Sequence, residues 1–453
     1  MEISEYKQYV RNKCISVIGI GVSNVPLIRF LVDAGANVTA HDKKEKERLG
    51  RIYEELLKIG VSFVLGGEYL TKIPENTEII FKTPGLRGDV PELLAAKKRG
   101  VTVTSEMELF FDICPCEIIA VTGSDGKTTT TTLIGEMLKG EGYKCFIGGN
   151  IGKSLIGEVE KITKDDKVVL ELSSFQLFSM RKSPKVAVVT NVTPNHLDWH
   201  TDFDEYVESK KNIMKFQDKA DVLVTNSAND VSKSIGDEAR GAHRSFSSQG
   251  DALVYLEDGF IIYDEEKIIK TSDIRIPGLH NVENYMAAIA ATRDYVSKET
   301  VEKVAKNFGG VAHRIEFVRE KDGVKFYNDS IASSPARTTA GLKSFAQKVI
   351  LIAGGYDKKI PFDDFGKVVN EYVKTLVLVG VTSPKIEKAV RNADNFNDIE
   401  IIRADAFEEA VISAKNSAKN GDIVLLSPAC ASFDLFDNFE QRGNIFKEIV
   451  MKF

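Results

Sequence analysis

The residue pattern best suited to chemistry in this sequence is a glycine-rich turn, TGSDGKTT, over residues 122–129. It directly follows a short apolar run and precedes a helical pattern. Backbone N–H groups of such a turn can cradle phosphates, and the start of the next helix adds positive potential. Lys127 would contact the β- and γ-phosphates, and the Thr128 hydroxyl would hold Mg²⁺. Val121 stands where the general pattern has a glycine, so the turn is a shortened form. The alternative is an ordinary strand-to-helix turn.

A second glycine-containing turn lies near the start of the chain, at Gly19-Ile-Gly21. Asn24 replaces the last glycine of a dinucleotide-binding pattern, and Asp42 follows at about the distance expected of a ribose-binding acid. A structural turn explains the pattern nearly as well as a nucleotide site does. A nicotinamide-dependent dehydrogenase therefore stays open, and the absorbance of bound cofactor would identify it.

Four further candidates follow predicted strands or lie on a predicted helix. Glu171 ends a strand on its carboxyl side, where open α/β sheets place ligands, and it could bind a metal or cap a helix. His196, in NVTPNHLD, follows another strand, but a lone histidine is more often structural. Lys210 and Lys211 lie on a helix predicted over residues 205–216, whose pattern by itself favours a solvated face.

The elements that would position these residues form three blocks of alternating strand and helix patterns. Near-continuous Val, Ile and Leu runs are typical of strands covered on both faces, and the βαβ rhythm predicts parallel sheets. We expect an α/β protein of three domains with boundaries near 105 and 311. The predicted strands are 15–20, 38–40, 78–81, 101–104, 118–121, 168–171, 186–189, 222–225, 349–352, 376–379 and 423–426.

The composition is that of a globular enzyme. The chain has 453 residues, of which 43% are hydrophobic and 28% charged, with a net charge of −6. Because the basic residues are scattered, we expect no nucleic-acid partner. The first residues lack a signal core and no apolar run could span a bilayer, so we expect a cytoplasmic protein without membrane insertion. The five cysteines are irregularly spaced, as expected of free thiols rather than zinc ligands.

Taken together, motifs along nearly the whole chain resemble those of the Mur ligases. The phosphate loop and the Ala312-His-Arg314 segment are also shared with folylpolyglutamate synthetases. The segments LELSSFQL from Leu170 and SPACASFD from Ser427 point to the D-glutamate-adding members. The other matching segments are GGNIG at Gly148, NVTPNHLDWH at Asn191, PGLHNVENYMAA at Pro277 and YNDSIASSPART at Tyr327.

The resemblance implies a three-domain ligase of peptidoglycan synthesis. The domains would be a Rossmann-like UDP-binding domain over 1–105, a P-loop ATP-binding domain over 106–311 and a Rossmann-like C-terminal domain over 312–453. The implied reaction joins D-glutamate to UDP-N-acetylmuramoyl-L-alanine through an acyl phosphate, with ATP converted to ADP and phosphate. Two Mg²⁺ sites, with Mn²⁺ tolerated, and a monomer are also implied.

The resemblance also assigns roles by motif position. Lys127, His196 and Lys210 would be catalytic, with Lys210 matching a lysine that is carbamylated in the family. Metal would be held by Thr128, Glu171, His196 and Lys210. ATP would contact Gly123, Ser124, Asp125, Gly126, Lys127, Thr128, Thr129, Asn281, Asn284, Arg314 and Asp329. The UDP substrate would contact Gly21, Val22, Ser23, Asp42, Thr83, Pro84, Gly85, Asn150, Ser173 and Gln176, with His196 near its alanyl arm. D-glutamate would contact Lys358, Ser432 and Phe439.

One departure and several alternatives bear on this interpretation. Ile331 stands where many members have a lysine, so any polar role at that position is lost or moved. The alternatives are another Mur-type ligase, a folylpolyglutamate-type ligase, and a P-loop switch that hydrolyses ATP without an amino acid. The separate βαβ block over the first hundred residues favours the Mur type over the folate type, which usually starts at the ATP domain.

Overall fold

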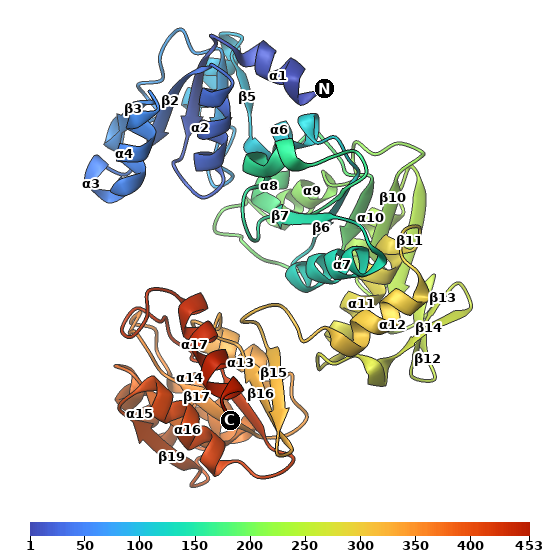
Figure 1. The fold of residues 1–453 in the computed structure, drawn as a ribbon, viewed down its shortest axis with the longest axis vertical. Helices are drawn as coiled ribbons and strands as arrows, with labels where there is room; N and C mark the ends of the chain where they lie inside the picture. Colours follow the sequence, from blue (N-terminus) through green and yellow to red (C-terminus); the bar gives the residue numbers. More distant parts are fainter. The chain divides into compact units, whose positions relative to one another are not determined.

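A computed structural model describes residues 1–453 and contains three β-sheets. The chain folds into two compact units (Figure 1). One unit comprises residues 1–271 and 283–304, and the other comprises residues 272–282 and 305–453. The first unit carries two of the sheets and the second unit carries the third. The mainly parallel sheets confirm the predicted α/β class.

The first sheet has five parallel strands in the order β3-β2-β1-β4-β5. Its centre is β1, which pairs with both β2 and β4, so the turns after these three strands lie along one edge. The strands are β1 Cys14–Ile18, β2 Asn37–Asp42, β3 Ser62–Leu65, β4 Ile79–Lys82 and β5 Thr102–Thr104. The helices of this part are α1 Ile3–Val10, α2 Asn24–Asp33, α3 Lys46–Leu49, α4 Arg51–Lys58, α5 Pro91–Lys98 and α6 Glu106–Ile113.

The second sheet has nine strands in the order β14-β13-β12-β11-β10-β9-β6-β8-β7. It is parallel from β7 to β12, and two antiparallel pairings add β13 and β14. The strands are β6 Ile118–Thr122, β7 Cys145–Gly149, β8 Lys167–Glu171, β9 Val186–Val189, β10 Val222–Asn226, β11 Ala242–Ser247, β12 Val254–Glu257, β13 Phe260–Tyr263 and β14 Glu266–Lys270. The helices that follow along the chain are α7 Lys127–Glu141, α8 Ser174–Leu177, α9 Phe203–Lys211, α10 Asp230–Gly236, α11 Leu279–Thr292 and α12 Lys298–Asn307.

The third sheet has six strands in the order β15-β16-β20-β17-β18-β19 and is parallel except for the β15–β16 hairpin. The strands are β15 Glu316–Lys321, β16 Val324–Asn328, β17 Val349–Ala353, β18 Val373–Val379, β19 Glu400–Ala404 and β20 Ile423–Leu426. The helices are α13 Pro335–Leu342, α14 Asp363–Tyr372, α15 Ser383–Arg391, α16 Phe407–Ser417 and α17 Phe439–Met451.

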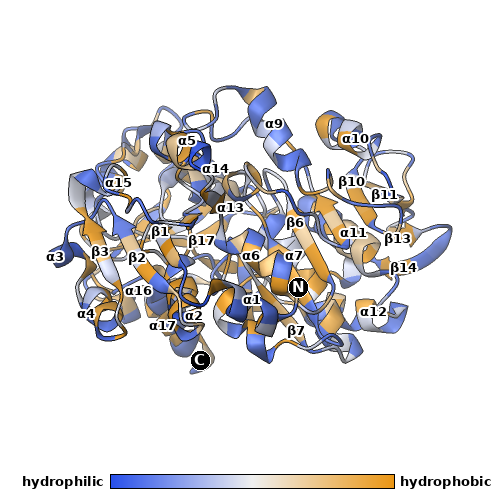
Figure 2. Cartoon of the chain, turned by 90° about the horizontal axis from the view of Figure 1, so that it is seen from above, coloured by the Kyte–Doolittle hydropathy of each residue, from blue (hydrophilic) through white to orange (hydrophobic).

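Apolar side chains of the central strands make the cores. Every residue of β6, β10 and β17 is buried, as expected of strands that helices cover on both faces. Colouring by hydropathy shows the contrast between β6, which is largely hydrophobic, and the short surface helix α3, which is hydrophilic (Figure 2). No helix has the length and apolar character required to cross a membrane.

One predicted element is too long. The helix expected over residues 205–216 begins at Phe203 and ends at Lys211 as α9. Asn212 ends it because its side-chain amide donates to the carbonyl oxygen of Leu177 at 2.9 Å, and tight turns follow. Lys210 and Lys211 therefore lie in the last turn of this helix.

Candidate active site

The phosphate loop joins β6 to α7 and depends on two glycines. Gly123 has φ +147°, and a Cβ there would lie 1.9 Å from the Thr190 hydroxyl. Gly126 has φ +78°, and a Cβ there would lie 2.4 Å from Oδ1 of Asn284. Only glycine fits both positions, so the backbone runs close to its neighbours while its N–H groups stay at the start of α7. This is the geometry of an anion-binding turn.

Residues after β9 hold this loop in shape. The Thr190 hydroxyl donates to the Asp125 carbonyl oxygen at 2.6 Å, and the Asp125 N–H donates to the side chain of Asn191 at 3.0 Å. On the other side of the loop, the Ser124 hydroxyl lies 2.9 Å from the Tyr206 hydroxyl. Asn191 and Tyr206 are polar residues of ordinary type in the sequence, and their role here comes only from the fold.

Lys127 and Thr128 are the first two residues of α7. The Lys127 ammonium donates to the carbonyl oxygens of Gly123 at 3.0 Å and Ser124 at 2.9 Å, so it lies over the loop. The Thr128 hydroxyl donates to Glu171 at 2.7 Å. Both side chains therefore lie at the helix start, where phosphate oxygens would bind.

Glu171, at the end of β8, accepts hydrogen bonds from two neutral side chains. One carboxylate oxygen accepts from Thr128 and the other accepts from the Asn150 amide at 2.8 Å. A hydroxyl and a carboxylate this close supply the oxygen ligands that Mg²⁺ prefers, so this part of the predicted metal set fits the ion. No group of three or more His, Cys, Asp or Glu side chains gathers at metal-binding spacing. Any ion here would need further ligands from substrate phosphates or water.

Lys210 is buried beside the phosphate loop. Only 1% of the residue is exposed, and its ammonium donates to the Gly123 carbonyl oxygen at 2.7 Å. Burial, followed by the positive charge of Lys127, holds the pKa of Lys210 well below its ordinary value. Lys211, by contrast, donates to Glu238 at 2.6 Å on the surface, and this bond raises its pKa. The solvated-face interpretation therefore suits Lys211 and is wrong for Lys210.

His196 lies in the exposed segment after β9, with φ +54°. Its ring packs 4.9 Å from that of Phe175, between ring centroids. His200, four residues on, is buried and its Nε2 lies 3.0 Å from the Ser174 hydroxyl. The metal role predicted for His196 stays a prediction.

An ion pair joins the first sheet to the helix that carries Lys210. Arg87, in the loop after β4, donates with both terminal nitrogens to Glu205 on α9, each at 2.9 Å. The pairing lowers the pKa of Glu205 to about 2. Trp199 adds a second link, because its indole N–H donates to the Gly85 carbonyl oxygen at 3.1 Å. None of these pairings had a signal in the sequence.

The residues predicted to bind UDP lie at the ends of β1, β2 and β4. Asp42 accepts backbone N–H bonds from Ile20 at 2.7 Å and Lys44 at 2.9 Å, so its carboxylate holds the turn around Gly21. Asn24, which replaces the expected glycine, donates to the carbonyl oxygens of Ile18 and Gly19. Val22 is 78% exposed beside this turn.

Several of the predicted substrate residues share one small pocket in the first unit. Ser23, Pro84 and Gln176 all line it, together with Lys82 and Glu106. Ser173 and Gln176 are also bonded to each other as the capping box of α8, so both have a structural role. Thr83 packs on Gly19, at the same edge of the first sheet. Burial lowers the pKa of Lys82 to about 8 and raises that of Glu106 to about 7.

The remaining predicted ATP residues are distributed over both units. In the first unit, Asn284 accepts from the Thr130 hydroxyl at 3.2 Å beside the phosphate loop, and Thr129 lies next to it on α7. In the second unit, Asn281 donates to the Pro277 carbonyl oxygen, and Asp329 accepts from Ser427 at 2.7 Å. Burial raises the pKa of Asp329 to about 7, against the opposing positive charge of Arg314.

The residues predicted to bind D-glutamate lie on loops of the third sheet. Lys358, after β17, donates to the Ser333 carbonyl oxygen at 3.3 Å. Ser432, after β20, is 2% exposed. Phe439 begins α17, and its carbonyl oxygen accepts from the Ser330 hydroxyl at 2.8 Å. Ile331 supplies only its backbone here, donating to the His313 carbonyl oxygen.

Comparison with known proteins shows similarity along the whole chain. Three family models match, described as Mur ligase MurD-like, N-terminal domain (residues 13–105), Mur ligase middle domain (121–292) and Mur ligase, glutamate ligase domain (313–430). A protein of Acetivibrio thermocellus named UDP-N-acetylmuramoylalanine--D-glutamate ligase is 54% identical over 99% of this chain and 98% of its own length. One of the same name from Ruminiclostridium cellulolyticum is 50% identical over the same shares. The structure of UDP-N-acetylmuramate-alanine ligase MurC from Thermotoga maritima has the same fold, with a TM-score of 0.59, 19% identity, and coverage of 97% of this chain and 99% of that one.

Proposed function

The chain belongs to the Mur ligase family, and we propose that it joins D-glutamate to UDP-N-acetylmuramoyl-L-alanine in peptidoglycan synthesis. The observation that carries the proposal is the identity of 50–54% over 99% of the chain to ligases named for this reaction. The reaction forms an amide bond and converts ATP to ADP and phosphate. We infer that it takes place in the cytoplasm, where ATP and UDP-sugars are made, and that the protein acts as a monomer.

ATP binding is supported by the phosphate loop. The N–H groups from Gly123 to Thr129 would hold the phosphates, and Lys127 would neutralise the charge that develops on the γ-phosphate. Thr128 and Glu171 would hold Mg²⁺, which supplies further neutralisation of the phosphate oxygens when bound. Asn281, Asn284, Arg314 and Asp329 complete the proposed nucleotide contacts.

The chemistry begins with a carboxylate, which is a poor electrophile whose charge repels the γ-phosphate. With that repulsion reduced, the alanyl carboxylate attacks phosphorus, and an acyl phosphate forms while ADP leaves. The neutral amine of D-glutamate attacks the acyl carbon, the tetrahedral intermediate collapses, and phosphate leaves. Gly21, Val22, Ser23, Asp42, Thr83, Pro84 and Gly85 would hold the UDP group, with Asn150, Ser173, Gln176 and His196 along the muramyl-alanine arm.

A carbamate on Lys210 is part of the proposal. A lysine must be neutral to react with CO₂, and burial beside Lys127 favours the neutral amine. The neutral amine forms a C–N bond to CO₂ and releases one proton, so an uncharged amine becomes an oxygen-bearing anion. With His196, that anion would hold a second Mg²⁺.

The direct test is ADP release with UDP-N-acetylmuramoyl-L-alanine and a panel of D- and L-amino acids. We expect saturable ADP release with D-glutamate and a coupled product whose mass equals the UDP substrate plus one glutamyl residue. Equal use of L-glutamate or L-lysine would contradict the proposed acceptor. A folylpolyglutamate-type enzyme would accept a folate instead of the UDP substrate, and ATP hydrolysis independent of any amino acid would indicate a P-loop switch.

A further inference from the structure

We propose that Arg442 is a positioning residue for the acceptor amino acid, because its guanidinium holds together the loops that carry Ser432 and Lys358. The inference rests on the proposed binding of D-glutamate at the third sheet. Arg442 lies in the first turn of α17 and is only 2% exposed.

The guanidinium donates hydrogen bonds to two different loops. Its Nε donates to the Ser330 hydroxyl at 3.0 Å and its Nη2 to the Ser330 carbonyl oxygen at 2.8 Å. Its Nη1 donates to the Ala431 carbonyl oxygen and its Nη2 to that of Cys430, both at 3.2 Å. Ser330 follows β16 and Ala431 follows β20, and these strands are parallel neighbours. One side chain therefore fixes the spacing of two adjacent loops.

A third loop is packed against the same group. The Ala431 carbonyl oxygen also accepts from the Tyr356 N–H at 2.9 Å, which ties in the loop after β17 that carries Lys358. A Cβ on Gly355 would lie 2.4 Å from the Ala431 oxygen and 3.3 Å from Nη1 of Arg442. The strands β16, β20 and β17 are consecutive in the sheet, so the loops with Ser330, Ser432 and Lys358 meet around one guanidinium.

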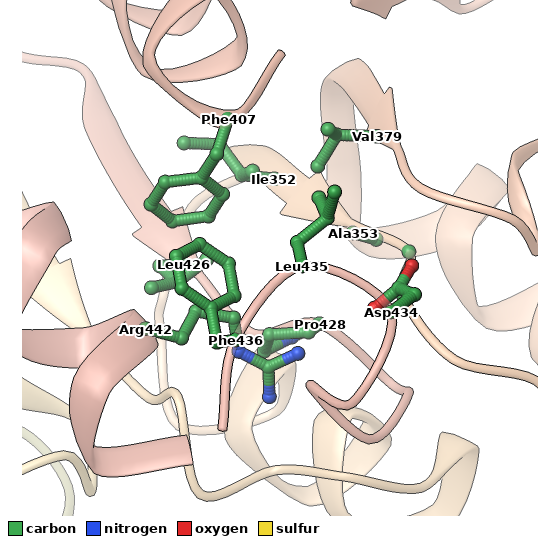
Figure 3. Close-up of a pocket in the computed structure, with 12 residues that line it drawn as sticks. Ile352, Ala353, Val379, Phe407, Leu426, Pro428, Asp434, Leu435, Phe436 and Arg442 are labelled. Atoms are coloured by element: carbon green, nitrogen blue, oxygen red, sulfur yellow. The ribbon is translucent and has the colours of Figure 1, made fainter. Parts of the chain in front are cut away.

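The acceptors of Arg442 are carbonyl and hydroxyl oxygens, so its charge is not neutralised through these hydrogen bonds. Burial lowers the pKa of Arg442 to about 10, which leaves it positive at neutral pH. Asp434 is the other charged residue that lines the small, mostly apolar cavity beside it (Figure 3). The negative charge of Asp434 acts on this cation, so the role proposed for Arg442 is to hold the acceptor loops rather than to supply charge to the acceptor. The planar fork that reaches two loops at once is specific to arginine.

The test is Arg442→Lys, which keeps the charge and removes the fork. We expect the KM for D-glutamate to rise about tenfold or more, because bonds from a charged donor to both loops are lost. The KM values for ATP and for UDP-N-acetylmuramoyl-L-alanine should stay within about twofold. Arg319→Lys is the matched control: Arg319 also donates to backbone carbonyl oxygens, those of Val450, Met451 and Phe453, and none of these belongs to the acceptor loops.

A selective rise in the KM for D-glutamate in Arg442→Lys, absent in Arg319→Lys, supports the inference. An unchanged KM, or a loss of stability that alters all three KM values alike, overturns it. If Arg442→Lys does not fold, Ser330→Ala removes the Nε acceptor together with the hydroxyl that donates to the Phe439 carbonyl oxygen, and it should raise the same KM about fivefold; no rise in that variant also overturns it. A wild-type protein without D-glutamate-dependent ADP release would instead contradict the proposed function itself.

Discussion

Replacing Lys210 by alanine tests the catalytic role proposed for this buried lysine, with Lys211 on the same turn of the helix as the control. An ordinary lysine has a pKa of about 10.4, so about one amine in a thousand is neutral near pH 7.4. Each unit by which the pKa falls raises that fraction about tenfold until the pKa reaches the pH of the solution. Lys210, 1% exposed and beside Lys127, has its pKa well below the ordinary value. A larger fraction of its amine is therefore in the neutral form that reacts with CO₂ than is the case for Lys211, whose pKa is raised by Glu238.

Lys210→Ala should lower kcat by about 100-fold, the scale of losing a group that orients a metal site. Added acetate or propionate should restore part of the rate, because a short carboxylate can occupy the position of the missing carbamate. Lys211→Ala should stay within about twofold of the wild type, as surface substitutions usually do. The assay is ADP release at saturating substrates, together with ¹³C NMR of the protein in ¹³C-bicarbonate.

Two results would refute this reasoning in different ways. Normal turnover in Lys210→Ala would exclude an essential carbamate. Severe loss in Lys211→Ala, with Lys210→Ala intact, would show that the match to the family motif is out of register. A ¹³C carbamate signal that persists in Lys210→Ala would place the modification on another lysine.

Three further predictions concern other parts of the chain. Lys127→Ala should abolish ADP formation yet leave the affinity for the UDP substrate, measured by calorimetry, unchanged. Lys127 begins α7, after β6 of the second sheet, whereas Asp42 ends β2 of the first sheet. A collapse of that affinity would contradict the assignment of the UDP and ATP sites to different sheets. Ser432→Ala should raise the KM for D-glutamate about 10- to 100-fold through loss of one hydrogen bond to a charged group, with the KM for ATP as the control. Glu106 has its pKa raised by burial from 4.5 to about 7, so the folded state holds more protons than the unfolded state in that window and stability falls as pH rises through it. Glu106→Gln should remove that fall and be more stable than the wild type above pH 7 by up to about 3 kcal/mol in chemical denaturation; equal pH profiles would disprove it.

The strands around the phosphate loop could be predicted because they are buried on both faces. β6, β8 and β9 are apolar runs bounded by turn residues, and the predicted ranges differ from the observed ones by one residue at most. Glu171 was therefore placed correctly at a strand end. The hairpin strands β12 to β16 were missed because their alternation is weak, although two Asp-Gly turns mark them. Asp258-Gly259 and Asp322-Gly323 both have positive φ at each residue, as a tight hairpin turn requires.

The sequence does not predict which residues form hydrogen bonds with each other in the candidate sites. The carbonyl oxygens that Arg442 holds have no sequence signature, since any residue type supplies a carbonyl. Lys210 and Lys211 have the same side chain, and only the packing of α9 buries the first fully and leaves the second partly exposed. Glu205 is one of many acidic residues in the sequence, and nothing in the sequence predicts its pairing with Arg87.

That pairing of Arg87 with Glu205 is a direct contact between the loop after β4 and the helix that carries Lys210. Arg87 follows the loop proposed to hold UDP, and Glu205 lies on the helix that carries Lys210. If UDP-substrate binding and carbamylation of Lys210 both depend on this ion pair, each must change the affinity for the other by the same factor. Dissolved CO₂ would then act as an effector of substrate binding as well as a reagent. Arg87→Gln would uncouple the two equilibria, so the UDP-substrate Kd of that variant would no longer depend on bicarbonate concentration.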